Sequence, residues 1–351
     1  MTSATIIDQL KKNCVDAVTE TDPDNLFLAD YMLHDFSARG MSSLGSTIGS
    51  GMGVLTGTKG SDSVAAIRQA QDYYGEPMAG NSVNATEHSI SSACMGIMSE
   101  TAMIEYFMDQ YPTGILSLVA DTFDLTKVVK PQGYIESLKD KILSREGKLV
   151  LRPDSSPRTP ADIICGHNDK LSERELEADY PEFYRKGLIQ CLWDIFGGTT
   201  NNQGYKVLDS HIGAIYGEAI GIEMQKEIYQ RLKDKGFAAT NILLGVGSKM
   251  FTFNTRDTLG FAAKGTHCVV DGKGVDIYKD PITSSGFKKS AKGRMRVDLV
   301  NGEYVTVDGV TSEEEAKGEL VPIYQDGKLL VETNLEEIRD RLNPQKETQG
   351  E

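Results

Sequence analysis

The polar stretch 82–90 carries a single histidine, His88, between two segments with helical spacing. Glu87 and Ser89 flank this histidine, so its imidazole has a carboxylate and a hydroxyl beside it. Such a histidine can exchange protons, or accept a phosphoryl group, near neutral pH. Taken alone, the stretch is better explained as a helix start, with Thr86 as the cap, Glu87 in the first turn and His88 in solvent. Polar groups elsewhere in the chain make a functional role for His88 the better explanation.

Further polar groups follow four apolar runs that predict buried strands. The runs are 115–119, 148–151, 211–216 and 241–244. The groups at their carboxyl ends are Asp121, Arg152, Asp154, Gly217, Glu218, Gly245, Gly247 and Ser248. Helical stretches separate the runs, at 126–143 with an interruption at a proline, at 184–196 and at 222–235. This alternation predicts an α/β fold with a parallel sheet, closed or nearly closed, whose chemistry lies at the carboxyl ends of its strands.

These strand ends suit a phosphate-rich ligand. Asp121 and Asp154 follow adjacent predicted strands, where two carboxylates can hold Mg²⁺ with its waters or face a cationic centre. Arg152 can donate two hydrogen bonds to a phosphate or carboxylate. A glycine-rich turn such as 245–248 lets backbone N–H groups approach a phosphate closely.

The first part of the chain adds three candidate groups. Phe36 and Arg39 could stack on and pair with a planar ring or anion, although a loop aromatic and a surface arginine often have no such role. Asp62 stands at the head of a helix predicted to end at Tyr74, where it would act as a cap. A helix with one apolar face is also predicted over 3–18.

Composition limits the classes of function. The chain has 351 residues, 39% of them hydrophobic, and no run of apolar residues long enough for a membrane span or a signal peptide. We therefore expect a soluble, cytoplasmic protein with a sizeable core. Its five cysteines are scattered, which favours reduced thiols over disulfides or a metal site.

The net charge of −14 argues against nucleic acid as the main partner. Any bound anion must therefore meet a local basic cluster. Positive charge gathers late in the chain, at Arg256, Lys264, Lys279, Lys288 and the rest of 288–294. The residues thus predict a phosphate-rich, Mg²⁺-assisted ligand at the mouth of an α/β barrel.

The order of several short motifs resembles the nicotinamide phosphoribosyltransferase family, and most closely its bacterial and phage branch. The motifs are LHDF at 33–36, GSD at 60–62, ATEHS at 85–89, Asp121, RPDS at 152–155, IYG at 215–217, GVGS at 245–248, TRD at 255–257 and KDP at 279–281. The resemblance extends from Leu33 to about Arg341, and the ordered set is far more specific than any one motif.

The resemblance implies an irregular (β/α) barrel of the type II phosphoribosyltransferase kind, acting as a homodimer. It implies transfer of phosphoribose from phosphoribosyl diphosphate to nicotinamide, with Mg²⁺ and with ATP that phosphorylates a histidine. We expect a catalytic barrel over 1–260 and a small, basic, β-rich C-terminal annex over 261–351. The family usually has an N-terminal domain before the matching segment, so we expect full activity to need a separately encoded N-terminal segment or dimerisation through 3–18.

The resemblance also implies roles for single residues. Phe36 would stack on the pyridine ring beside Arg39, and Asp62 would accept a hydrogen bond from the carboxamide. His88 would be the phosphorylated residue, while Asp121 and Asp154 would hold Mg²⁺ and steady the ribosyl cation. The remaining substrate contacts would be Ser82, Ser117, Arg152, Gly217, Glu218, Gly245, Gly247, Ser248 and Arg256, with Lys264, Lys279 and Lys288 facing the diphosphate.

Two other functions stay open. A nicotinate enzyme of the same fold is disfavoured because the Asp62 carboxylate would repel the substrate's carboxylate. A non-catalytic subunit that binds nucleotide is the second. The sequence also departs from the family pattern at Glu218, where aspartate is usual, at Asn84, where proline is usual, and at 156–157, where a glycine is expected.

Overall fold

The computed structural model describes residues 1–155, 158–217, 220–253, 258, 263–280 and 290–342. The chain forms two compact units, Met1–Ser290 and Ala291–Glu351. The sequence placed a boundary at 260, thirty residues before the one between these units. The difference lies in the hairpin of β10 (His267–Val270) and β11 (Lys273–Asp276), which packs against α4 (His88–Met95) in the first unit.

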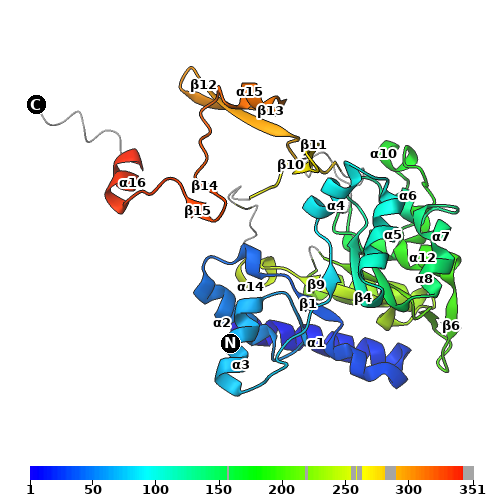
Figure 1. Cartoon of the computed structure of the whole chain (residues 1–351). Helices are drawn as coiled ribbons and strands as arrows, with labels where there is room; N and C mark the ends of the chain where they lie inside the picture. Colours follow the sequence, from blue (N-terminus) through cyan, green and yellow to red (C-terminus); the bar gives the residue numbers. More distant parts are fainter. Residues whose placement is uncertain (156–157, 218–219, 254–257, 259–262, 281–289, 343–351) are drawn as a thin grey trace, which may run out of the picture. The chain divides into compact units, whose positions relative to one another are not determined.

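A seven-stranded sheet forms the centre of the first unit, and each neighbouring pair of its strands is parallel (Figure 1). The strand order is β2-β1-β9-β8-β5-β4-β3. The strands are β1 (Leu33–Asp35), β2 (Gly60–Ser61), β3 (Asn84–Ala85), β4 (Thr113–Val119), β5 (Glu146–Arg152), β8 (Ile212–Tyr216) and β9 (Ile242–Val246). The predicted α/β class and parallel sheet are confirmed.

The two ends of the sheet are joined through Asn81. This residue bridges in parallel to Gly60 of β2, just before the chain enters β3. Its backbone N–H donates to Lys59 O at 2.7 Å, and its carbonyl accepts from Ser61 N at 3.0 Å. The sheet therefore curves far enough to bring its edges together, as a nearly closed barrel requires.

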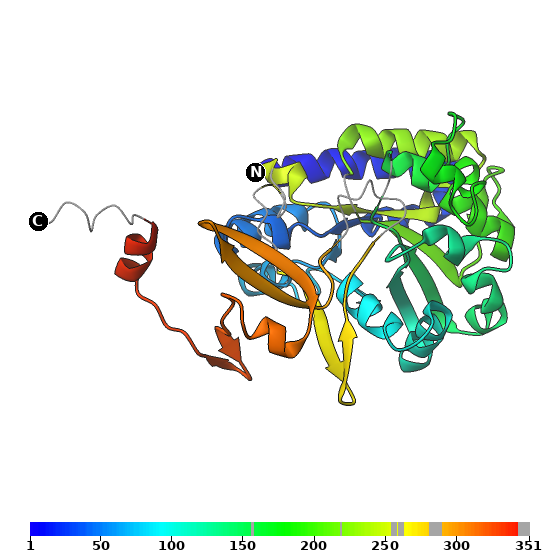
Figure 2. The ribbon, with the colours of Figure 1, turned by 90° about the horizontal axis from the view of Figure 1, so that it is seen from above.

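Helices cover the sheet, and the long pair α1 (Thr2–Thr21) and α13 (Ile222–Asp234) lies side by side (Figure 2). The buried apolar positions of α1 are Ile7, Leu10, Cys14 and Val18, the spacing of one helical face. Gln225 of α13 is fully buried and donates to Leu10 O at 3.0 Å. Its Oε1 accepts from Asn13 Nδ2 at 2.9 Å, so the buried amide is satisfied by donors and acceptors of α1.

The four predicted strands are β4, β5, β8 and β9, whereas the short β1, β2 and β3 were not predicted. Two predicted helical stretches are divided in the structure, the first of them at the proline where an interruption was predicted and the second at a glycine that was not. The stretch 126–143 is three short helices, α6 (Leu125–Val129), α7 (Tyr134–Ser137) and α8 (Lys139–Leu143), interrupted around Pro131. The stretch 184–196 is divided at Gly187, whose φ of +77° ends α11 (Phe183–Lys186) and precedes α12 (Leu188–Phe196).

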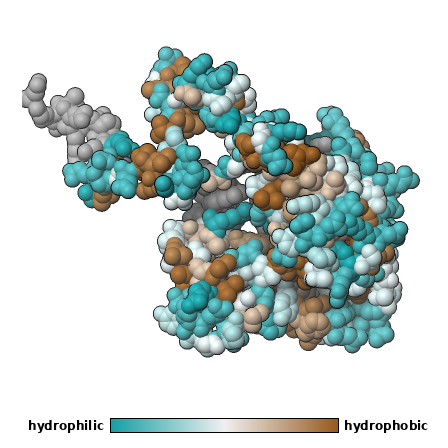
Figure 3. All heavy atoms as spheres, in the orientation of Figure 1, coloured by the Kyte–Doolittle hydropathy of each residue, from teal (hydrophilic) through white to brown (hydrophobic). Residues whose placement is uncertain are grey.

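The first unit contains further short elements. They are η1 (Pro23–Asp30), η2 (Ala38–Gly40), α2 (Leu44–Val54), α3 (Val64–Tyr74), α5 (Glu100–Gln110), α9 (Pro160–Cys165), α10 (Glu173–Leu176), β6 (Gly198–Thr200), β7 (Lys206–Leu208), η3 (Ala239–Asn241) and α14 (Lys249–Thr252). All five cysteines are free thiols, as predicted. The face of this unit seen in Figure 3 is largely hydrophilic, with apolar side chains in small patches.

The second unit is β-rich. Its main feature is the antiparallel hairpin of β12 (Arg294–Val300) and β13 (Glu303–Val310), followed by α15 (Ser312–Glu315). A two-stranded ladder of β14 (Tyr324–Gln325) and β15 (Lys328–Leu329) and the helix α16 (Leu335–Leu342) complete it. No helix within the described part of the chain is both long and apolar enough to cross a membrane.

Close contact between β4 and β5 gives a test of the sheet. Gly147 is paired with Gly114, and a Cβ built on Gly147 would lie 2.0 Å from Gly114 O. Gly147→Ala should therefore lower the free energy of unfolding by about 1–3 kcal/mol, because the strands must move apart. Urea unfolding measures this change. The control Gly49→Ala lies on the exposed face of α2 with no atom within 4 Å of the new Cβ, and should be neutral or stabilising by up to about 1 kcal/mol.

Candidate active site

The buried carboxylate of Asp35 joins the loops that follow β1 and β2. Asp35 Oδ1 accepts the Ser37 N–H at 2.9 Å, and Oδ2 accepts the Ser63 hydroxyl at 2.7 Å. The backbone N–H of Asp62 donates to Asp35 O at 3.0 Å. Phe36 and Asp62 are thereby held beside each other at the carboxyl edge of the sheet, although the sequence places them on separate motifs.

The ring of Phe36 lies in a space made by glycines. A Cβ built on Gly245 would come within 2.5 Å of the ring, and one on Gly217 would lie 3.8 Å from it. The His34 ring packs at 4.7 Å between centroids, and the Arg152 guanidinium lies 5.9 Å from the ring centroid. A side chain at position 245 would therefore displace the aromatic ring. The sequence instead suggested that Gly245 serves a phosphate-binding loop.

Asp62 does not cap α3, whose N-cap residue is Ser63. Its carboxylate is half-buried, and Oδ1 accepts from His34 Nε2 at 2.8 Å and from Ser82 Oγ at 2.6 Å. Burial would raise the pKa of the Asp62 carboxyl, but these two hydrogen bonds and the charge of Arg152 hold that pKa below its ordinary value. Asp62 is therefore an anion at neutral pH.

His88 meets both predicted aspartates. Its Nε2 lies 3.3 Å from Asp121 Oδ1 and 3.7 Å from Asp154 Oδ1. The backbone N–H of Asp154 donates to Asp121 Oδ2 at 3.0 Å, so the loops after β4 and β5 are tied together. The side chains of His88 and Asp121 are only 14% and 1% exposed, which rules out the solvated histidine considered above.

The stretch before His88 is held to the sheet by Thr86. Its Oγ1 accepts the Val119 N–H at 3.0 Å, and α4 has Glu87 rather than Thr86 as its N-cap. The helix-cap explanation for Thr86 is therefore wrong. Arg152 is buried and donates to Thr86 O, with one guanidinium nitrogen 3.4 Å from Glu87 Oε1.

A divalent cation can be held by part of this cluster. One donor atom from each of His88, Asp121 and Asp154 lies within 4.8 Å of the others. The carboxylate oxygens suit Mg²⁺, which keeps several waters, whereas an imidazole nitrogen suits softer metals. The donor set thus fits Mg²⁺ on Asp121 and Asp154, with the imidazole outside the coordination sphere.

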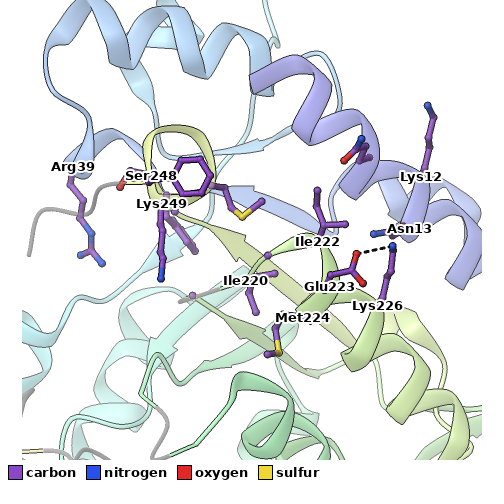
Figure 4. A pocket seen from close by; sticks show the side chains of 18 residues that line it. Lys12, Asn13, Arg39, Ile220, Ile222, Glu223, Met224, Lys226, Ser248 and Lys249 are labelled. Carbon is purple, nitrogen blue, oxygen red and sulfur yellow. Dashed lines mark hydrogen bonds and ion pairs between the residues drawn. The ribbon is translucent and has the colours of Figure 1, made fainter. Parts of the chain in front are cut away.

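A cavity of about 950 Å³ opens beside Phe36 (Figure 4). From the predicted set it is lined by Phe36, Arg39, Gly217, Gly247 and Ser248. Lining residues that the sequence did not indicate include Lys12 and Asn13 of α1, Ile222, Glu223 and Lys226 of α13, and Lys249 of α14. Arg39, Lys249 and the open backbone at Gly247 give this cavity donors for an anion.

Other predicted residues are placed less directly. Ser117 is buried in β4, paired with Ala85 and Val150. Lys264 is exposed, and Lys279 follows β11; among the described residues neither lines the cavity. Three predicted site residues lie outside the described residues: Glu218, Arg256 and Lys288.

The sequence missed a further acid near this site. Glu100 is the first residue of α5, and loss of water contact raises the pKa of its carboxyl to about 8. The nearby carboxylates of Asp124 and Asp121 add to this increase. No local signal in the sequence brings Glu100 to Asp124, because the fold alone joins these segments.

Comparison with known proteins agrees with this geometry. Residues 31–326 match the Nicotinate phosphoribosyltransferase (NAPRTase) family. The nicotinamide phosphoribosyltransferase of Acinetobacter baylyi is 42% identical over 326 residues, which cover 90% of this chain and 61% of that protein. The corresponding proteins of Xanthomonas campestris pv. campestris and Mycoplasma pneumoniae are 31% and 35% identical, over 97% and 84% of this chain and 68% and 59% of their own lengths.

The chain thus spans about three fifths of the length of the first of these relatives. Among solved structures, nicotinate-nucleotide pyrophosphorylase from Pyrococcus furiosus is similar over 98% of this chain and 70% of its own, with a TM-score of 0.38 and 16% identity. That structural similarity is too distant to bear on function.

The raised pKa of Glu100 predicts a pH dependence of stability. The folded state keeps a proton that the unfolded chain releases, so Glu100 costs increasing stability between about pH 4.5 and pH 8. Glu100→Gln should gain roughly 1–3 kcal/mol relative to the unsubstituted chain when pH rises from about 5 to 8, as urea unfolding can measure.

The control for this prediction is Glu105→Gln on the same helix, an exposed carboxylate that pairs with Lys141 at 3.0 Å. It should show no such gain. Parallel stability curves for Glu100→Gln and the unsubstituted chain would contradict a protonated Glu100.

Proposed function

Because the chain belongs to the nicotinate phosphoribosyltransferase (NAPRTase) family, we propose that it transfers phosphoribose from phosphoribosyl diphosphate to nicotinamide. The products are nicotinamide mononucleotide and diphosphate. The names of the relatives that match most of the chain support this choice of base. Formation of nicotinamide mononucleotide by the purified chain, with and without ATP, tests the proposal.

The observation that carries the proposal is that the anionic Asp62 and the ring of Phe36 both contact His34. The ring offers a flat apolar face for a pyridine, at a site reached from the cavity. The ionised carboxylate accepts a hydrogen bond from a carboxamide NH₂ and repels a carboxylate. This pair therefore favours nicotinamide over nicotinate.

The carboxylates of Asp121 and Asp154 suit the other half of the reaction. Bond cleavage at the anomeric carbon puts positive charge on the ribose, which two nearby anions stabilise more strongly in the transition state than in the substrate. Bound Mg²⁺ would neutralise the developing charge of the leaving diphosphate. Gly247 and Ser248 would supply donors for the 5′-phosphate, and Lys264, Lys279 and Lys288 would face the diphosphate across a homodimer interface.

His88 would accept a phosphoryl group from ATP. Its Nε2 faces Asp121 and Asp154, while Nδ1 has no hydrogen-bond partner among the described residues. The Nδ1 lone pair would attack the γ-phosphorus, and the bond to the β–γ bridging oxygen would break to release ADP. Asp121 would hold the Nε2 proton and stabilise the ring as it becomes positive.

A non-catalytic subunit would lack a reason to keep the His88, Asp121 and Asp154 cluster. Binding of the nucleotide without product formation would nevertheless identify that alternative. Turnover of nicotinate at a rate equal to that of nicotinamide would identify the nicotinate enzyme.

Base selectivity gives the first functional prediction. Asp62→Asn removes the charge that repels nicotinate, so the ratio of kcat/KM for nicotinamide to that for nicotinate should fall by at least about tenfold. Steady-state assays with both bases measure the ratio. Asp72→Asn, at an exposed aspartate paired with Arg68, should leave it unchanged. An unaltered ratio in Asp62→Asn would remove Asp62 from the base site.

Phosphorylation of His88 gives the second functional prediction. Incubation with γ-labelled ATP should give a protein label that is acid-labile and alkali-stable, and His88→Ala should abolish it while leaving much of the ATP-independent reaction. The control His211→Ala removes a histidine that pairs with Asp209 before β8 and should keep the label. A label that persists in His88→Ala would exclude His88 as the acceptor.

A further inference from the structure

The two oxygens of the Asp62 carboxylate have different surroundings. Oδ1 accepts both the His34 Nε2–H at 2.8 Å and the Ser82 hydroxyl at 2.6 Å. Oδ2 has no hydrogen-bond partner among the residues that the structure describes. One oxygen is therefore saturated by protein donors, and the other is left as the acceptor for a ligand.

His34 is built into the sheet rather than into a loop. It lies in β1, in register with Gly60 of β2 and with Gly245 of β9. A Cβ on Gly60 would lie 2.9 Å from its Nδ1, and a Cβ on Gly245 would collide with the Phe36 ring that packs on the imidazole. Glycine on both neighbouring strands thus leaves room for the two rings, whose planes are tilted by 38°.

The imidazole also has a defined hydrogen-bonding role. A carboxylate only accepts, so the nitrogen facing Asp62 must carry the hydrogen. His34 is 9% exposed, so its side chain cannot swing into solvent as the exposed Ser82 can. Of the two donors to Asp62 Oδ1, His34 is therefore the one that fixes the direction of the Asp62 carboxylate.

We propose that His34 is the positioning residue that sets base selectivity. Its Nε2–H holds Asp62 Oδ1 and turns Oδ2 toward the plane of the ring stacked on Phe36, where it meets the carboxamide of nicotinamide. His34 touches no reacting atom and acts through Asp62. The inference rests on the proposed function, since it specifies how that base site distinguishes amide from carboxylate.

Two substitutions separate the hydrogen bond from the packing of the ring. His34→Phe keeps an aromatic ring against Phe36 but removes the donor. His34→Gln removes the ring but keeps an N–H at the position of Nε2. Ser82→Ala removes the second donor to the same oxygen from an exposed loop, where loss of folding is not at issue.

The measurement is calorimetric titration of each protein with nicotinamide and with nicotinate, together with steady-state kinetics. His34→Phe should weaken nicotinamide binding by about tenfold or more, with a similar loss in the ratio of the two dissociation constants, because a hydrogen bond to a charged group is lost. His34→Gln should keep the ratio within about threefold, and Ser82→Ala should reduce it less than His34→Phe does. KM for the base should rise while kcat at saturation changes little.

Each outcome decides between the two hypotheses. If the unsubstituted chain distinguishes the bases and His34→Phe retains the ratio, the inference fails and the proposed function stands. If His34→Phe and His34→Gln lose the same amount of base selectivity, the effect comes from packing of the ring, and the inference also fails. If the unsubstituted chain binds neither base, the proposed function fails and the inference fails with it.

Discussion

The site depends on a carboxylate that never meets water. Asp35 is fully buried, and a polar group in that position is tolerated only when hydrogen-bond donors satisfy it. Ser37 and Ser63 supply those donors from the loops after two neighbouring strands. Because separation of the two loops would take hydrogen bonds away from a buried carboxyl group, it is costly, and the aromatic ring and the acid that the loops carry are held in one arrangement.

The Arg152 side chain connects this corner to the cluster of His88, Asp121 and Asp154. Arg152 lies near the Phe36 ring, contributes to the low pKa of Asp62, and donates to the backbone just before His88. One guanidinium therefore contacts the segments that we assign to the base and to the phosphorylated residue. Its burial limits how far either segment can move without breaking a charged contact.

Much of the arrangement could be predicted because it follows from strand ends. Parallel strands bring their carboxyl ends to one edge, so the polar residues after β4 and β5 were expected together, and Asp121 and Asp154 are indeed linked. The short β1 and β2 have too few residues to give a periodic signal, which is why the contact of His34 with Asp62 was not predicted. Glu100 was missed for a related reason, since its environment is made by segments distant in sequence. The requirement for glycine at position 245 could not be predicted either, because only the folded chain brings the Phe36 ring against this position.

The link through Asn81 affects more than the shape of the sheet. An edge strand normally exposes unpaired N–H and C=O groups, which recruit strands from other molecules and begin aggregation. Here the outer side of β2 is occupied by the chain's own backbone, with Lys59 O and Ser61 N both bonded to Asn81. Closure at this point therefore protects a concentrated solution of the protein from strand addition at β2, in addition to holding the loop after β2 in place.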